Sequence, residues 1–382
     1  MAKKQLESYA KSRALSSIRF EAIEHYTEDH GITLADEPTD AYGRLPKAAA
    51  SEDAREFKNL FEKGFAKWTR VPPIWRYMMA GAIGKTGMTT QLLCSNALIR
   101  ERASHTMIDV ISRHWKETRH YPNRRWWFVT IIGDSGNMLE YQPEMNLAAF
   151  QADALQIIKA TGLHAIGATE FQAINNFPQN GHGRTIMANS HFICWTDNPL
   201  FDAACVEKRL CATSPLAHWL GAKTVKIDPI KASHRHLTWK AYYMLKAPVD
   251  GKYLTRNEET PSGWSFNRTT LRVDLVVRLM ELLCQLEFPQ MVLAVGDGKQ
   301  LRDDWLDDLQ SWHQLCLDKT LWPHDHDMAD AWAWLQSRRN RSKPRHPFHL
   351  SMPSTTPSRW LRAAEGAMEQ MPATRRHSKI LR

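Results

Sequence analysis

Two tyrosines and a lysine on one amphipathic segment form the first group of residues that suggests chemistry. In TWKAYYMLKAP, Lys246 follows Tyr243 by three residues and Tyr242 by four, so either phenol can share a helix face with the ammonium group. A phenol with a pKa of about 10 is a poor nucleophile at neutral pH, and a nearby cation stabilises the phenolate. The spacing indicates a candidate tyrosine nucleophile, against the alternative of two amphipathic core tyrosines.

A second polar group lies on two predicted strands upstream. The segments HAIGATEFQAI and RTIMANSHFICWT alternate as strands do, and strand residues two apart point to the same face. Asn189 and His191 therefore share a face, and Glu170 lies on one face of the preceding strand. If the faces coincide, an acid, an imidazole and an amide converge and can hold Mg²⁺ or Mn²⁺ with positions left for a phosphate. The alternative for His191 is a hydrogen-bonded core histidine.

The surrounding segments predict four regions. Residues 1–120 are expected to be mainly helical, and 121–255 change to a strand, helix, strand, strand texture that ends with the tyrosine helix. After a Gly/Pro/Ser loop near 255–265, residues 266–336 are expected to be a helical region, in which LRVDLVVRLMELLCQLEF and DDWLDDLQSWHQLCL read as packed helices. Residues 337–382 form a basic, Pro/Ser/Thr-interrupted tail that is expected to be disordered.

Charge is concentrated in that tail. Residues 337–382 contain 11 Lys and Arg against 2 Asp and Glu, an excess that equals the net charge of +9 for all 382 residues. A basic arm of this kind supplies salt-sensitive phosphate binding, and the alternative is a tail that only aids solubility. The sequence thus favours contact with nucleic acid.

Cysteine usage and hydropathy bound the environment. The six cysteines form no CxxC pair, the N-terminal residues offer no apolar signal segment, and the longest apolar run, WWFVTII, is too short to cross a bilayer. We expect a reduced, cytoplasmic protein without membrane contact.

The order FVTIIG, IGATEFQ, a histidine-bearing hydrophobic strand and Tyr-x-x-Lys resembles the HUH endonuclease family, specifically rolling-circle replication initiators of plasmids and phages. The resemblance covers residues 121–315. It implies that 128–132 form the central strand, that His191 is the second histidine of the metal motif, and that Glu170 is an added metal ligand. It also makes Tyr243 the nucleophile and Lys246 its partner, with Tyr242 as the fallback. Asn189 stands where the family has its first histidine, so the motif is degenerate.

The resemblance implies an α+β fold with a central antiparallel, ferredoxin-like sheet flanked by helices. It further implies a divalent-metal-dependent nuclease that attacks single-stranded or hairpin DNA and leaves a 5′-phosphotyrosine and a free 3′-hydroxyl. Glu170, His191 and Asn189 would hold the metal, and a host helicase would act in trans. Two alternatives stay open: a DNA-binding protein on the same scaffold without catalysis, and a transposase that uses the same chemistry.

Overall fold

The computed structural model describes residues 45–66, 91–139, 144–176, 184–216, 222–259, 263–317 and 349–350. Of the expected helical N-terminal region, 1–44 and 67–90 lie outside these ranges, as does the expected tail apart from His349–Leu350. The described residues from Pro46 onward belong to one compact unit. Within the described ranges, no helix is long and apolar enough to cross a membrane.

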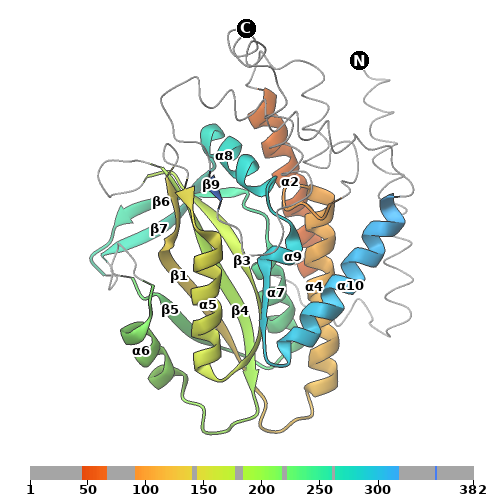
Figure 1. Ribbon diagram of the computed structural model, residues 1–382, viewed down its shortest axis with the longest axis vertical. Helices are drawn as coiled ribbons and strands as arrows, with labels where there is room; N and C mark the ends of the chain where they lie inside the picture. Colours follow the sequence, from red (N-terminus) through yellow and green to blue (C-terminus); the bar gives the residue numbers. More distant parts are fainter. Residues whose placement is uncertain are drawn as a thin grey trace. The chain divides into compact units, whose positions relative to one another are not determined.

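A seven-stranded sheet organises this unit (Figure 1). Its order is β5-β1-β4-β3-β6-β7, and β8 pairs with β3 beside β6. All pairings are antiparallel except that of β3 with β6, so the α+β class is confirmed and the sheet is mixed rather than wholly antiparallel. The strands are β1 Arg125–Leu139, β3 His164–Ile174, β4 Thr185–Thr196, β5 Val225–Ile230, β6 Asp250–Arg256, β7 Trp264–Thr270 and β8 Val292–Val295, with β2 Glu144–Met145 and β9 His349–Leu350 as a separate parallel pair.

Helices α5 and α6 connect strands of the sheet. The chain runs β1-α5-β3-β4-α6-β5, with α5 spanning Leu147–Thr161 and α6 spanning Ala203–Thr213. Asn146 caps α5 by accepting a hydrogen bond from the Ala149 amide, and Gly162 ends it with a φ of 75°, where a side chain would be strained. Gln151 of α5 donates to Thr169 of β3, which fixes α5 on the Thr169 face of the sheet.

The opposite face is covered by α7, His234–Leu245, which packs beneath α4, Ala97–Thr118. Ser233 caps α7 by accepting from the His236 amide, and Asn96 caps α4. Helices α2, Pro46–Ala66, and α10, Gly298–Leu317, pack on α4 in turn. Trp305 of α10 is fully buried and donates to the Ala103 carbonyl of α4, so segments from both ends of the described chain share one core.

Strand β4 lies between β1 and β3, and every one of its twelve residues is buried. Helices cover both of its faces, so its polar side chains cannot reach bulk water and must find partners in the protein. On the α5 face, Ser190 hydrogen-bonds Thr169 at 3.0 Å. The other face carries Asn189 and His191.

Two segments differ from the sequence interpretation. The loop expected near 255–265 connects the two strands of a hairpin, and the second strand, β7, occupies the start of the region that was expected to be helical from 266 onward. The segment 288–295, read as helical, contains the short helix α9, Phe288–Met291, and then strand β8. VLAV is too short for periodicity to separate helix from strand, and pairing with β3 decides the outcome.

Candidate functional site

The strand register brings three of the predicted site residues together. Glu170 of β3 lies directly opposite Asn189 of β4, and Ala168 lies opposite His191. Since opposed residues share a face and strand side chains alternate, Glu170, Asn189 and His191 all point to the α7 side of the sheet. The convergence that the sequence made conditional on register is therefore present in the structure.

His191 is held between two hydrogen-bond partners on neighbouring strands. Its Nε2 lies 2.9 Å from Oε1 of Glu170, and its Nδ1 lies 3.0 Å from Oγ1 of Thr130 on β1. Phe128 stacks on the imidazole with an interplanar angle of 11°. These contacts fix the position and orientation of the ring. The same contacts also give both ring nitrogens a hydrogen-bond partner, as expected of a structural histidine in the core. The Glu170–His191 pair alone therefore does not define a function.

Glu170 is buried beside positive charge. Burial by itself would raise the pKa of this carboxyl, but the charge and hydrogen bond of His191, with Lys246 and Asn189, outweigh burial and leave the pKa below its usual value. The side chain therefore stays ionised near neutral pH.

Asn189 supplies a buried oxygen that has no hydrogen-bond partner among the described residues. Its Oδ1 is unsatisfied, while its side chain forms a hydrogen bond that helps to lower the pKa of Glu170. Leaving a buried carbonyl oxygen unpaired costs about 1–3 kcal/mol. Such an oxygen beside a carboxylate suits a cation, since amide and carboxylate oxygens are both ligands of Mg²⁺ and Ca²⁺.

The geometry of the pair is compatible with a metal ion. Two neighbouring ligands of an octahedral Mg²⁺ at about 2.1 Å lie about 3 Å from each other, and the Glu170 oxygen and His191 nitrogen are 2.9 Å apart. In the part of the chain that the structure describes, no group of three His, Cys, Asp or Glu side chains surrounds a common point. The donors present are therefore one carboxylate, one imidazole and one amide oxygen, which fit a cation with several positions left for other ligands.

Tyr243 of α7 lies against this group. Its ring meets His191 edge-on, with 5.1 Å between centroids, and also contacts Phe128 at 5.9 Å. The residue remains 38% exposed, so the phenol borders both the buried pair and solvent. This position separates Tyr243 from an ordinary core tyrosine.

Cations flank the Tyr243 ring. The Nζ of Lys246 lies 4.6 Å from the ring centroid, and that of Lys240 lies 6.0 Å from it and 4.2 Å from the Phe128 ring. Burial and then the Glu170 charge raise the pKa of Tyr243, while Lys246 lowers it, with a net shift upward. The phenol is thus neutral at pH 7, and neutralising the Glu170 charge would favour the phenolate.

Tyr242 is directed to a different contact. Its hydroxyl donates to Oδ2 of Asp53 on α2 at 2.6 Å, and its ring packs edge-on against Trp239. The two tyrosines therefore have different surroundings, with Tyr243 beside the Glu170–His191 pair and Tyr242 between α7 and α2. This separation argues against Tyr242 as the fallback nucleophile.

Three residues of the site were not singled out from the sequence. The contact of Thr130 with His191 depends on the β1–β4 register, which the sequence does not reveal. Lys240 could have been predicted, because it lies three residues before Tyr243 on the same helix. Arg100 is a buried charge on the apolar face of α4, in line with Ala103 and Met107, and that helical spacing could have identified it.

Comparisons with protein-family models, with curated proteins and with solved structures gave no match to this chain.

Proposed function

We propose that this chain nicks single-stranded DNA by attack of Tyr243 on a backbone phosphate, in the manner of an HUH-type replication initiator. The observation that carries the proposal is the position of the Tyr243 ring, edge-on to a histidine hydrogen-bonded to a buried carboxylate, with a lysine ammonium 4.6 Å from the ring centroid. An acid, an imidazole, a phenol and a cation from three separate elements meet at one partly exposed place.

The reaction is a phosphoryl transfer. The Tyr243 oxygen forms a bond to phosphorus, the bond from phosphorus to the 3′ oxygen breaks, and that oxygen leaves as a 3′-hydroxyl after taking up a proton. The phenol proton passes to solvent, which reaches this partly exposed ring. Lys246 stabilises the phenolate and, once DNA is bound, the phosphate charge.

A divalent metal held by Glu170, His191 and Asn189 would polarise the phosphate. The chain's own contribution is to fix these donors. Thr130 holds the imidazole by its far nitrogen, a contact that sets ring orientation in metal-binding histidines. The unsatisfied Asn189 oxygen favours this use of the site.

The fold supports the proposal through its connectivity. The run β1-α5-β3-β4-α6-β5, with strand order β5-β1-β4-β3, follows a βαββαβ order, which supports the proposal of a ferredoxin-like sheet. Strand β4, which carries the histidine, lies next to β1, and the tyrosine helix α7 comes directly after the last strand of this run, β5. That arrangement is the one expected of an HUH nuclease.

A path for the DNA strand extends from the site along the β6–β7 hairpin. Ile174, on the same face as Glu170, pairs with Lys252, and the same hairpin face continues through Phe266 and Trp264. Arg256 stacks on Trp264 at 5.0 Å. Cations and aromatic rings in one line suit a single strand, whose bases stack and whose phosphates need counter-charge.

The test is covalent trapping. Incubation with single-stranded or hairpin DNA and Mg²⁺ or Mn²⁺ should give an adduct that survives denaturant. Tyr243→Phe should abolish it, because the nucleophilic oxygen is lost, while Tyr242→Phe, the matched control on the neighbouring residue, should keep it. A covalent adduct that still forms with Tyr243→Phe would refute the proposal.

One alternative has its own supporting observation. Asn189 replaces an imidazole ligand, and the Glu170–His191 hydrogen bond is complete without metal. Both suit a DNA-binding protein that has lost nicking. Tight, salt-sensitive binding without any adduct would favour this function. A transposase that uses the same chemistry would give the same covalent adduct. The helicase partner and the cytoplasmic location remain predictions.

A further inference from the structure

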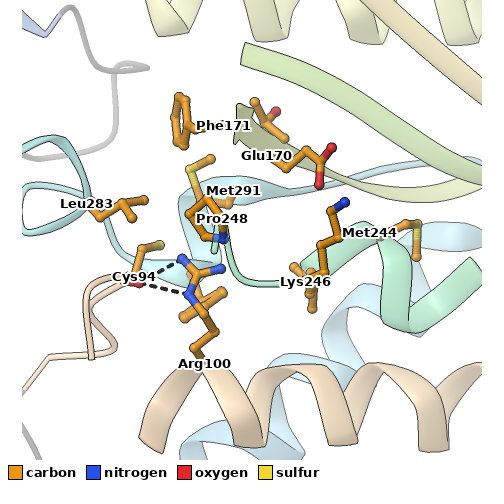
Figure 2. Close-up of a pocket in the computed structure, with 12 residues that line it drawn as sticks. Cys94, Arg100, Glu170, Phe171, Met244, Lys246, Pro248, Leu283 and Met291 are labelled. Carbon is orange, nitrogen blue, oxygen red and sulfur yellow. Dashed lines mark hydrogen bonds between the residues drawn. The ribbon is translucent and has the colours of Figure 1, made fainter. Parts of the chain in front are cut away.

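A pocket lies beside Glu170, lined by residues of β3, α4 and the segment at the end of α7 (Figure 2). Three charged side chains line it, namely Glu170, Lys246 and Arg100, and the remaining wall is mostly apolar, including Met244 and Met291. Three charges around one small apolar-walled space are unusual, because each charge must be removed from water.

Arg100 is the most deeply placed of the three. Its residue is 6% exposed, and its guanidinium lies between the rings of Phe57 and Phe288, at 5.0 and 5.1 Å. Nε and Nη2 both donate to the Cys94 carbonyl, at 3.2 and 2.7 Å. The dashed lines in Figure 2 mark these two bonds, and the third nitrogen of the guanidinium points away from Cys94 into the pocket.

That third nitrogen, Nη1, makes no hydrogen bond to any described residue. Within the same ranges, Arg100 also forms no ion pair with a carboxylate. Burial lowers the pKa of Arg100, although the charge of Glu170 acts through space to raise it. Burial also raises the pKa of the Cys94 thiol to about 12, so this thiol is neutral and supplies no counter-charge. The buried guanidinium is thus left with one free donor and no direct counter-ion.

Lys246 adds a second cation at the partly exposed end of the pocket. Its ammonium group lies over the Tyr243 ring and acts on Glu170 through space, without an ion pair to any residue in the described ranges. Oε1 of Glu170 accepts a hydrogen bond from Nε2 of His191, so this carboxylate already interacts with another partner. The pocket holds two cations against one engaged carboxylate, and a buried cation without a partner is costly.

We propose that this pocket binds a phosphate group, with Arg100 Nη1 and Lys246 Nζ as its donors. Arginine and lysine are the two side chains that proteins use most for phosphate, the former as a directional donor and the latter as a point charge. The group can come from free inorganic phosphate or from the 5′ end of a short DNA strand. The proposal does not require Tyr243 to react.

The experiment is a thermal-unfolding titration with inorganic phosphate at constant ionic strength, with chloride as the replaced anion. We expect a saturable rise in Tm for the full chain and for Tyr243→Phe. Arg100→Gln and Lys246→Gln should each weaken the apparent affinity at least about tenfold, because each removes one of two charge-assisted hydrogen bonds. Arg119→Gln, a matched loss of an exposed charge at the end of α4, should bind as the unaltered chain does.

Equal phosphate affinity in the unaltered chain and Lys246→Gln would overturn the proposal, as would the absence of any saturable effect. Lys246→Gln decides the matter if Arg100→Gln does not fold. A 5′-phosphorylated trinucleotide that competes with phosphate, when its unphosphorylated form does not, identifies the strand end as the source. If phosphate binds but neither trinucleotide competes with it, the ligand of the pocket is free inorganic phosphate. Binding in Tyr243→Phe without any DNA adduct in the unaltered chain would retain this site and reject only the nicking proposal.

Discussion

At the scale of single residues, the Glu170–His191 pair joins two roles. The hydrogen bond of 2.9 Å between them stabilises the centre of the sheet, and the same two atoms are the donors that a cation would use. A proton or a metal ion can occupy the space between them, and each excludes the other. A metal ion at Nε2 would therefore need the neutral imidazole with its proton on Nδ1, beside Thr130.

Glu170→Gln should lower the free energy of unfolding by about 2 kcal/mol at pH 7, since a charge-assisted buried hydrogen bond is lost. The pKa of Glu170 is lower in the folded chain than its ordinary value of 4.5. Below that value the unfolded chain takes up the proton first, so the unaltered protein loses this stability as the pH falls through the folded pKa. Urea unfolding of both proteins between pH 7 and pH 3 measures the difference, which should shrink toward acid. A constant difference would show that Glu170 is not held ionised by His191.

The sequence could predict which polar residues share a strand face but not which faces meet. Period-two alternation placed Asn189 and His191 together, whereas their meeting with Glu170 and Thr130 depends on the registers of β3 and β1 against β4. Spacings of four and three residues let both Tyr242 and Tyr243 share a helix face with Lys246, so spacing alone did not separate them. Their distinction comes from the packing of α2, which supplies Asp53 to Tyr242.

At the scale of elements, the β6–β7 hairpin presents two different faces. Phe266 lies on the face that continues from Glu170 and is 38% exposed, whereas Tyr253 lies on the opposite face and is 48% exposed. Phe266→Ala should weaken single-stranded DNA binding by about 1–3 kcal/mol, the cost of one lost stacking contact. Fluorescence anisotropy with a labelled oligonucleotide measures this change.

Tyr253→Ala is the matched control for the hairpin, because it removes a comparably exposed ring from the other face of the same hairpin. Its affinity for the oligonucleotide should stay within about threefold of the unaltered chain, which corresponds to about 0.6 kcal/mol. If Tyr253→Ala weakens binding as much as Phe266→Ala, the strand does not follow the Glu170 face.

The elements themselves were predictable where their patterns were long. Strands β1, β3 and β4 and helices α5, α7 and α10 follow segments with clear periodicity. Strand β7 was assigned to the helical region that was expected from 266 onward, and β8 was read as helix because four apolar residues have no diagnostic period. Both gain their strand structure from pairing with β3, through β6 and β8, which is a tertiary effect.

At the scale of the whole molecule, the net charge of +9 is the main electrostatic feature. Replacing the four cations Arg375, Arg376, Lys379 and Arg382 by Gln should reduce non-specific affinity for single-stranded DNA. The slope of log affinity against log salt should become shallower by up to about 3, since each lost phosphate contact removes about 0.7. Anisotropy titrations over a range of salt concentrations measure the slope. An unchanged slope would show that the C-terminal cations do not contact DNA.

The same four replacements should leave covalent chemistry intact at saturating DNA, because the proposed nucleophile and metal donors all lie on β3, β4 and α7. This outcome separates general affinity from the site. A loss of adduct formation that saturating DNA does not restore would place the C-terminal segment within the reacting site.

The most direct test of the central claim is the identity of the residue joined to DNA. Trypsin cleavage after Lys240 and Lys246 releases AYYMLK, which contains both tyrosines. After nuclease digestion of the trapped adduct, fragment-ion mass spectrometry of this peptide should place a phosphonucleotide on Tyr243 and leave Tyr242 unmodified. The modification on Tyr242, or on a peptide from elsewhere in the chain, would contradict the account.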